Sequence, residues 1–498
     1  MDRYIRINKA DNVAVAVHPL RSGDSIELDG LRLVLSEDIP AGHKFALKDL
    51  REGENVIKYG FPIGHLIADA KAGTLIDHSK LKTNLEGLLE YTYHPQTTDI
   101  QPDSTPATFM GYRRTDGNVG IRNQIWIVPT VGCVNGTAER LADLFRKEIE
   151  GHEGSVDAVV AYPHNYGCSQ LGDDHENTRK ILRDIVLHPN AGGVLVVGLG
   201  CENNQMDAFR KFIGPVDSKR IRFMETQKVD GDEIEYGLQL LREIHTACSG
   251  DKREEIPVSE LRVGLKCGGS DGLSGITANP LLGLFSDWIV SQGGTTVLTE
   301  VPEMFGAETL LMNRCCDRST FDSMVGMING FKEYFMKNGQ PVYENPSPGN
   351  KAGGISTLEE KSLGCTQKSG SSTVRGVLPY GERLSVKGLN LLCAPGNDLV
   401  ASTALASAGC QIVLFTTGRG TPFGTFVPTV KISTNTPLAV RKPRWIDFNA
   451  GTAVEGTSWH DLLKHFIEFV LGVASGNAVN NEKSGFREIA IFKTGVTL

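Results

Sequence analysis

Four cysteines follow short apolar segments and lie in tight, glycine-containing loops: Cys133, Cys168, Cys201 and Cys267. Thiolates are ligands for soft metal ions, and three of them can hold an iron–sulfur cluster that leaves one iron open to substrate. The competing interpretation is packing, because cysteine is small and readily buried and therefore suits a crowded turn. The four loops together favour a metal or cluster site more than any one of them does.

The same loops carry imidazole and carboxylate groups, which suit a divalent iron or manganese ion. The candidate metal ligands are Cys168, Cys201, Glu202, Cys267 and Asp271, with Cys133, His175 and Glu300 as alternatives and His164, Asp173 and Glu176 as further groups of this kind. Structural roles compete here too, because Glu202 could cap a helix and Asp271 could stabilise its own turn. The residues alone leave open whether one ion or a cluster is bound.

Glycine-flanked positions also display groups that can bind an anion or transfer a proton. The guanidinium of Arg419 lies between glycines and can hold a carboxylate through two hydrogen bonds. Lys351 and Lys368 can bind an anion, or act as a base if they are desolvated. His43 and Lys44 directly follow a turn glycine, where we expect their side chains to be displayed. The candidate acid–base residues are His43, Lys44, His164 and Lys351, and the candidate substrate ligands are Ser270, Asn350, Arg419 and Thr421.

A mostly parallel sheet would position these loops, because loops at the carboxyl ends of parallel strands meet at one edge. From residue 109 onward, apolar segments alternate with glycine-rich loops and helical patterns, which is typical of a doubly wound α/β fold. Within residues 261–280 a buried strand stops at Cys267, turns through Gly-Gly-Ser-Asp-Gly and leads into a helix. The predicted strands span residues 124–130, 156–161, 193–197, 261–265, 295–298, 389–394 and 411–416, and the predicted helices include 137–150, 317–337 and 459–473.

The first 92 residues differ, because short alternating segments between turn glycines predict a small all-β module. A segment with three prolines follows, so we expect a linker that leaves the module free to dock elsewhere. The predicted division is a β module over 1–92, a linker over 93–108, a central α/β catalytic domain over 109–370 and a C-terminal α/β domain over 371–498.

The bulk properties exclude several classes of protein. A net charge of -8 over 498 residues, with both signs mixed, provides no basic face for nucleic acid. No apolar run is long enough to span a membrane, and the amino terminus has no signal or lipidation pattern. Ten cysteines without a small-domain spacing favour free thiols or metal ligands, as in the cytoplasm. We therefore expect a cytoplasmic α/β enzyme that uses a metal on a small anionic substrate.

Several stretches carry a resemblance to one family: DNVAVAV, GHKFAL, YGCSQLGDDHENT, GLGCENNQ, KCGGSDGLSGITANP, NPSPGNKAGG and TTGRGTPFG. Through them the chain resembles the altronate and galactarate dehydratase family along essentially its whole length. The resemblance implies an SAF-like β-clip module joined to a Rossmann-like parallel α/β catalytic region. It also implies conversion of D-altronate to 2-dehydro-3-deoxy-D-gluconate and water, in hexuronate breakdown, with a requirement for Fe²⁺ or Mn²⁺.

That reaction needs a base at C2, an acid for the hydroxyl that leaves C3, and a cation that holds the enediolate. We expect His43 or Lys44 to act with His164 or Lys351, and Arg419 to share the charge with the metal. The alternatives are a dehydratase of another sugar acid such as galactarate, an iron–sulfur hydro-lyase, and a non-catalytic sugar-acid-binding protein. A nicotinamide oxidoreductase is disfavoured, because no glycine loop matches the dinucleotide fingerprint. A homodimer through the β module is a further expectation.

Overall fold

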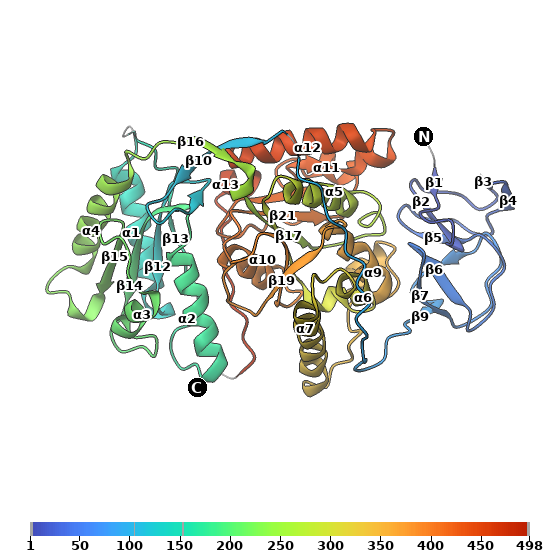
Figure 1. Ribbon diagram of the computed structural model, residues 1–498, viewed down its shortest axis with the longest axis horizontal. Coiled ribbons are helices and arrows are strands. Elements are labelled where there is room, and N and C mark those ends of the chain that lie inside the picture. The colour runs from blue at the N-terminus through green and yellow to red at the C-terminus, as the bar shows by residue number, and fades with distance from the viewer. Residues whose placement is uncertain (1–2, 104, 152–153, 496–498) are drawn as a thin grey trace.

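The computed structural model describes residues 3–103, 105–151 and 154–495 and contains three bodies side by side (Figure 1). An N-terminal β module lies at one end, and a four-stranded parallel sheet with its helices lies at the other. A seven-stranded parallel sheet stands between them. The expected fold class, α/β with a small all-β module at the amino terminus, is confirmed. None of the helices in the described ranges is long and apolar enough to cross a membrane.

The N-terminal β module consists of short antiparallel strands joined by tight turns. All four residues of strand β2 (Val13–Ala16) are buried. Because successive side chains of a strand point in opposite directions, both faces of β2 are covered by protein. Ala14 packs into the core of the module, whereas Val15 packs against Leu273 and Ile276 of the central body, so an apolar face docks the module. The other strands are β1 (Tyr4–Ile5), β3 (Ser25–Leu28), β4 (Leu31–Val34), β5 (Lys44–Ala46), β6 (Asn55–Lys58), β7 (Phe61–Leu66), β8 (Leu75–Ile76) and β9 (Leu81–Lys82).

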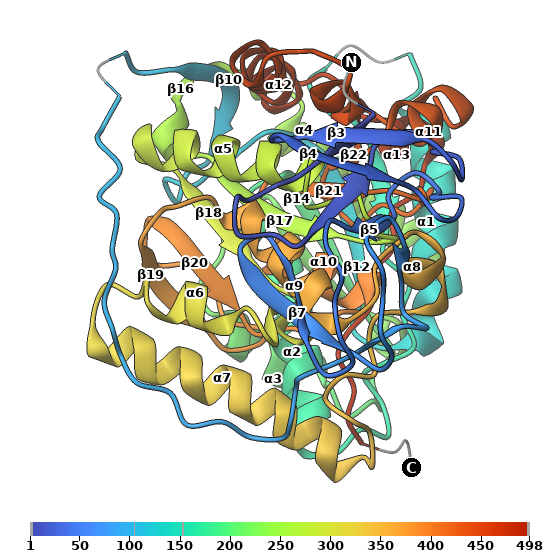
Figure 2. The same ribbon diagram turned by 90° about the vertical axis from the view of Figure 1, so that its right-hand side faces the viewer.

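The connecting segment is fixed to the central body. Residues 84–103 contain no helix or strand and run past the long helix α7 (Arg318–Lys337) (Figure 2). The hydroxyl of Tyr91 donates to the Glu308 carboxylate at 2.6 Å, and that of Tyr93 donates to the Cys315 carbonyl at 2.7 Å. The prolines and low apolar content of this segment predict a free linker. The two tyrosine hydrogen bonds instead hold it against the central body.

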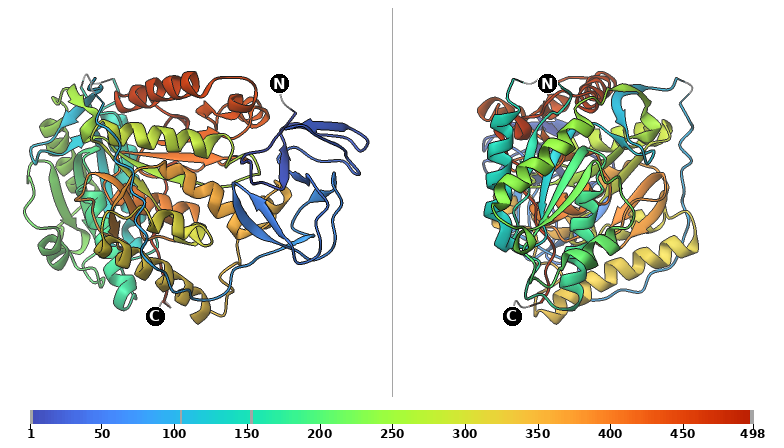
Figure 3. Two further views of the ribbon diagram at one scale, coloured as in Figure 1. Left: turned by 45° about the vertical axis from the view of Figure 1, so that its right-hand side comes forward. Right: turned by 90° about the vertical axis from the view of Figure 1, so that its left-hand side faces the viewer.

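The four-stranded sheet has the order β13-β12-β14-β15, and all its strands are parallel. Successive side chains of β12 point to opposite faces of the sheet and so contribute to two hydrophobic cores. Trp126 and Val128 lie in one core, and Ile125 and Ile127 lie in the other. The first face packs on α2 and α3, and the second packs on α1 and α4 (Figure 3). The bounds are β12 (Gln124–Pro129), α1 (Asn135–Glu148), β13 (Val159–Ala161), α2 (Gly172–Val186), β14 (Ala191–Gly198), α3 (Met206–Ile213), β15 (Ile221–Glu225) and α4 (Glu233–Cys248).

The seven-stranded sheet has the order β19-β20-β18-β17-β21-β22-β23 and is also parallel. Its strands are β17 (Arg262–Cys267), β18 (Thr295–Leu298), β19 (Val374–Leu378), β20 (Gly388–Leu392), β21 (Ile412–Thr417), β22 (Thr429–Ser433) and β23 (Phe448–Asn449). Because β17 and β18 precede residue 370 and the other five strands follow it, the domain boundary predicted at 370 falls inside one sheet. A local strand-and-helix pattern could not show this, since strand order depends on long-range pairing.

Helices and a small antiparallel sheet complete the central body. The principal helices are α5 (Ala278–Ser291), α7, α9 (Leu358–Thr366), α10 (Asp398–Ser407) and α12 (Trp459–Ala474), and the short ones are α6 (Glu308–Met312), α8 (Pro348–Ala352), α11 (Thr436–Arg441) and α13 (Asn480–Ser484). Strands β10 (Thr108–Arg113), β11 (Val119–Gly120) and β16 (Glu254–Pro257) form the small sheet. All nine residues of α9 are buried, although three of them are charged. Such a helix must place its charges against partners, which marks its surroundings as the polar centre of the protein.

Candidate functional site

Loops at the carboxyl edge of the seven-stranded sheet meet the turn of the β module that carries His43. The Gly272 amide donates to the Gly353 carbonyl at 2.8 Å, and a Cβ atom on Gly272 would overlap the carbonyl oxygen of Gly42. Glycine is required at such a close approach of two backbones. The turn at Gly42 and His43 therefore lies directly against this edge, where a Cβ atom on Gly354 would also meet the Gly42 carbonyl and the His43 amide.

A buried ion-pair network crosses the same interface. Lys44 donates to the Glu360 carboxylate at 2.8 Å and to Ser356 Oγ at 2.6 Å, and Lys58 donates to the other Glu360 oxygen at 2.8 Å. Burial would raise the pKa of Glu360, but the two ammonium groups outweigh it and hold that pKa at about 2. Lys44 is fully buried, so the expectation that it is displayed after the turn glycine is wrong. It belongs to β5, whose residues all face protein.

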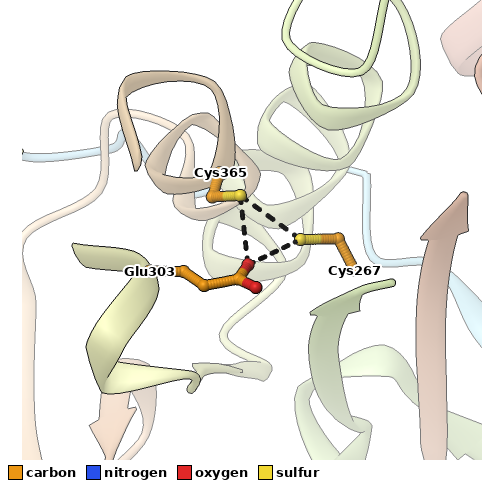
Figure 4. A group of neighbouring side chains, drawn as sticks. All are labelled: Cys267, Glu303 and Cys365. Atoms are coloured by element: carbon orange, nitrogen blue, oxygen red, sulfur yellow. Dashed lines mark hydrogen bonds between the residues drawn. The ribbon is translucent and has the colours of Figure 1, made fainter. Parts of the chain in front are cut away.

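Two cysteines and a glutamate form a compact group beside this network. Cys267 at the end of β17, Glu303 in the short 3₁₀-helix η4 (Val301–Met304) and Cys365 in α9 point toward one another (Figure 4). The two sulfurs are 3.3 Å apart, and each lies 3.2 Å from the same carboxylate oxygen. In the described ranges this is the one set of at least three His, Cys, Asp or Glu ligand atoms close enough together to hold a single metal ion.

Lysines surround the Cys267–Glu303–Cys365 group. Lys368 lies 2.8 Å from the Cys267 sulfur, and Lys361 lies 2.7 Å from the second Glu303 oxygen. Burial opposes ionisation of Glu303, yet the lysines outweigh it and hold the pKa of this carboxyl at about 2. The hydrogen bond that Cys365 shares with Cys267, together with burial, raises the pKa of the Cys365 thiol. Without a metal the group is therefore a carboxylate held by lysines next to a protonated Cys365.

The predicted ligand Glu300 supports this group from one side. Its carboxylate accepts from the Cys267 amide at 3.0 Å and pairs with the buried Lys266, while burial raises its pKa. Its backbone is left-handed, with φ of 70°, which is unfavourable for a side chain of this size and is a feature of constrained sites. Glu300 orients Cys267 and lies outside the compact group.

The side of this edge near the module has unsatisfied polar groups. Ser270 is 2% exposed and its hydroxyl has no partner, which makes it available to a ligand. A cavity of about 10 Å³, lined by Ser270, Lys361 and Cys365 among others, connects it with the compact group. This volume admits roughly one water molecule. A hydroxyl fits there, whereas a whole sugar acid does not.

Arg419 and Lys351 stand on the outer side. The exposed Arg419 lies in the loop after β21, with its guanidinium beside Gly349 at the start of α8. Asn350 of the same helix has a partner on each polar side-chain atom, since its oxygen accepts from Ser347 Oγ at 2.9 Å and its nitrogen donates to the Ser270 carbonyl at 2.8 Å. Thr421 accepts from the Phe423 amide at 3.3 Å. Arg419 thus remains the predicted substrate ligand best placed to reach outward.

Asp271 is saturated by its own surroundings. Its oxygens accept from Thr434 at 2.9 Å, Asn435 at 3.1 Å and Ser274 at 3.1 Å, and burial raises its pKa. The side chain braces its own turn and is not a member of the compact group. This arrangement matches the alternative prediction, in which Asp271 stabilises its own turn.

The remaining predicted ligands lie in the four-stranded sheet, away from the compact group. His164 accepts from the Tyr166 amide at 3.1 Å and its other ring nitrogen lies 2.8 Å from the Pro129 carbonyl; burial lowers its pKa to about 4. Glu202 accepts from Thr130 Oγ1 at 2.6 Å and from the Gly200 amide at 2.6 Å. Cys133, Cys168 and Cys201 are exposed at this second edge, and His175 lies in the first turn of the neighbouring helix α2. The sequence predicts that four thiols converge. In the structure Cys133, Cys168 and Cys201 lie at the edge of the four-stranded sheet, whereas Cys267 lies at the edge of the seven-stranded sheet.

Several members of the buried site escaped sequence reasoning. Glu303 lies three residues after Glu300, and Cys365 and Lys361 lie in a charged stretch that normally forms a solvent-exposed helix face. The available signal was the stretch EEKSLGC, in which three consecutive charged residues precede glycine and cysteine without forming an amphipathic stripe.

Comparison with known families matches three consecutive parts of the chain. Residues 2–84 match the altronate/galactarate dehydratase SAF domain, residues 111–249 match the second domain of D-galactarate dehydratase/altronate hydrolase, and residues 258–497 match the C-terminal domain of D-galactarate/altronate dehydratase. The first match covers the β module, the second contains the four-stranded sheet, and the third contains the seven-stranded sheet.

Individual relatives match over the full length. The chain is 57% identical over 499 aligned positions to altronate dehydratase of Bacillus subtilis and 56% identical over 496 to that of Escherichia coli, with all of each chain covered. It is 35% identical over 492 positions to the L-threo-forming galactarate dehydratase of Escherichia coli, which covers 95% of this chain and 93% of the relative.

Proposed function

Because this chain belongs to the D-galactarate/altronate dehydratase family, we propose that it removes water from D-altronate to form 2-dehydro-3-deoxy-D-gluconate. The observation that carries this is the contrast between 57% and 35% identity, over nearly the whole chain, to altronate and galactarate dehydratases. The enzyme is a carbon–oxygen hydro-lyase acting on a sugar acid. A cytoplasmic location and a homodimer through the β module stay predictions.

The chemistry assigns different tasks to the two sides of the site. A proton next to a carboxylate is weakly acidic, so its removal requires that the enediolate charge be held in place. Arg419 would bind the substrate carboxylate through two hydrogen bonds. Ser270 would donate its unpartnered hydroxyl to the substrate. The enol left after loss of the C3 hydroxyl then tautomerises to the 2-keto acid.

His43 is our proposed base at C2. Burial lowers the pKa of its imidazole below 6.5, so the ring is neutral at pH 7 and can accept a proton. Lys351, on α8 beside the Arg419 loop, is the proposed acid for the leaving hydroxyl. Lys44 and His164 are poorer candidates, because Lys44 is paired with Glu360 and both ring nitrogens of His164 face backbone partners.

The Cys267–Glu303–Cys365 group would hold the divalent metal. Two sulfurs and one carboxylate oxygen suit Fe²⁺ better than Mn²⁺, which prefers oxygen ligands. Lys368 contacts the Cys267 sulfur, so metal binding would have to displace this ammonium group. When bound, the ion would supply Lewis-acid stabilisation of the enediolate.

The first test measures 2-keto acid formation by anaerobically purified protein, with and without Fe²⁺. The panel contains altronate, galactarate, glucarate, mannonate and sulfolactate. We expect iron-dependent product from altronate. Product from another acid alone would overturn the substrate assignment, and tight binding without turnover of any acid would show a sugar-acid-binding protein.

A second test addresses the base. His43→Ala should lower kcat/KM by roughly 10²- to 10⁴-fold, the range for a general base. His78→Ala is the matched control, because His78 is an exposed histidine of the same module. Normal turnover by a folded His43→Ala enzyme would refute this role for His43.

A further inference from the structure

Three exposed cysteines lie at the carboxyl edge of the four-stranded sheet. Cys133 follows β12, Cys168 follows β13 and Cys201 follows β14, and these strands are parallel neighbours in the sheet. Parallel neighbours bring the loops at their carboxyl ends to one edge. The proposed dehydration site uses none of the three thiols.

Hydrogen bonds next to each cysteine hold the three loops together. The Gly132 amide donates to the Tyr166 carbonyl at 3.0 Å, which joins the first loop to the second. The Asn204 amide donates to the Gly167 carbonyl at 3.1 Å, and Asn203 accepts from the Ser169 amide at 2.8 Å, which joins the second to the third. A Cβ atom on Gly167 would overlap the Thr130 carbonyl, so these loops approach as closely as backbones allow.

Buried polar side chains hold this arrangement from below. Glu202 is 2% exposed and ties the third loop to Thr130 of the first at 2.6 Å. His164 is also buried and accepts from the Tyr166 amide within the second loop at 3.1 Å. Buried polar groups of this kind cost stability unless they are fully paired, so their use here indicates a rigid support.

Asn204, between the loops, has an unsatisfied atom. Its side chain is 2% exposed and donates to the Thr130 carbonyl at 3.4 Å, while its Oδ1 has no partner. A buried carbonyl oxygen without a donor is uncommon in native proteins and points to a group that the chain itself does not supply.

The donors and charges suit a thiolate-bound cluster. Gln227 directs its amide toward the Cys201 sulfur at 3.7 Å, and the Ser169 hydroxyl lies 4.0 Å from the Cys168 sulfur. Hydrogen bonds to cysteine sulfurs tune iron–sulfur centres. Helices α1, α2 and α3 also begin at this edge, and their amino-terminal dipoles favour negative charge.

A single ion suits the arrangement less well. Three thiolates on one tetrahedral ion lie about 3.8 Å apart, because each metal–sulfur bond is about 2.3 Å. In the described ranges, the set of ligand atoms that meets a 4.8 Å limit is the buried one around Cys267, and the three exposed cysteines do not form such a set. A cluster bridges a wider separation, since its own irons and sulfides lie between the thiolates.

We propose that Cys133, Cys168 and Cys201 bind a [4Fe–4S] cluster, each thiolate holding one iron and the fourth iron lacking a protein ligand. The cysteines are exposed, so that iron faces solvent and can take an oxygen donor of a small hydroxy acid. This site is separate from the Cys267–Glu303–Cys365 group and does not depend on the function proposed for that group.

The test is anaerobic reconstitution of the full chain with equal amounts of ferrous and ferric iron and with sulfide, followed by desalting. We expect about four irons and four sulfides per chain, visible absorption, and a cluster signal by Mössbauer spectroscopy. The triple variant Cys133→Ser, Cys168→Ser, Cys201→Ser should lose the sulfide and the visible band. Cys267→Ser and Cys316→Ser, which alter thiols outside this edge, should keep both.

The outcomes separate the two sites. A cluster that survives the triple variant, or that disappears in Cys267→Ser, would overturn the assignment. Absence of iron and sulfide from the reconstituted wild-type chain would overturn it as well. Circular dichroism of each variant shows whether it is folded, and single Cys→Ser variants replace the triple variant if that protein is not.

Discussion

The two parallel sheets build opposite kinds of site from the same strand–loop–helix unit. At the seven-stranded sheet, the β module covers the edge, and Cys267 and Cys365 lie among buried lysines and glutamates. At the four-stranded sheet, Cys133, Cys168 and Cys201 remain exposed. The difference is the covering module, because burial changes how strongly charges interact and which ligands can reach them.

Charged groups at the covered edge are buried and need partners of opposite charge, whereas groups at the open edge are solvated by water. Mutations should therefore act through stability and pKa at the covered edge and through ligand binding at the open one. The following predictions test this contrast.

The largest effect is expected from Glu360→Gln, which leaves the buried ammonium groups of Lys44 and Lys58 without a carboxylate. Breaking a buried pair costs about 3–5 kcal/mol of unfolding free energy, measurable by urea denaturation. Glu359→Gln is the matched control, because the neighbouring carboxylate accepts from the neutral Thr83 and the Asn84 amide. Equal losses in the two variants would contradict a special role for the ion pairs.

The same network should weaken in acid. The lysines hold the pKa of Glu360 at about 2, below its usual 4.5, so its stabilising contribution is present above pH 4.5. It is lost as the pH falls from 4.5 toward 2.

Arg419→Ala should lower kcat/KM for altronate by about 10²- to 10³-fold, the usual cost of losing one charge-stabilising donor. Arg419→Lys should recover only part of it, because lysine cannot form the two-pronged contact. Arg444→Ala, at another exposed arginine, is the control. If Arg419→Ala kept kcat/KM within about twofold of the wild-type value, Arg419 would not be a substrate ligand.

The pH profile of kcat/KM should show an acid limb with a midpoint below 6.5. Burial lowers the pKa of His43, and the neutral ring is the base, so activity falls about tenfold per pH unit below that pKa. A limb centred above pH 7 would assign the base to another group.

The smallest effect is expected for Cys133→Ser in metal-free protein. An exposed side chain outside the core should change the unfolding free energy by no more than about 0.5 kcal/mol. The buried Cys365→Ser should cost more, because it places a hydroxyl where a sulfur is packed. A larger loss for Cys133→Ser than for Cys365→Ser would reverse the comparison of the two edges.

Local sequence patterns predicted the strands and loops well. The strand over residues 295–298 has the predicted limits, and β17 ends at Cys267 as the glycine turn indicates. The glycine-flanked Arg419 is exposed, as expected. These features depend on neighbours in sequence, where apolar periodicity and turn chemistry act directly.

Long-range pairing explains the failures. Glu303 and Cys365 are 62 residues apart, and their contact arises only when η4 and α9 pack together. The boundary predicted at residue 370 falls inside a sheet because β18 pairs with β20 across it. Lys44 is buried because a carboxylate 316 residues away neutralises it.

By itself the sequence determined the fold class, the loops that carry reactive groups, and the family. Tertiary structure decided which of those groups meet, placing Cys267 with Glu303 and Cys365 and leaving the three other strand-end thiols at a second edge. The reason is physical: propensity and periodicity act over a few residues, whereas burial and charge pairing depend on every element that packs around a group.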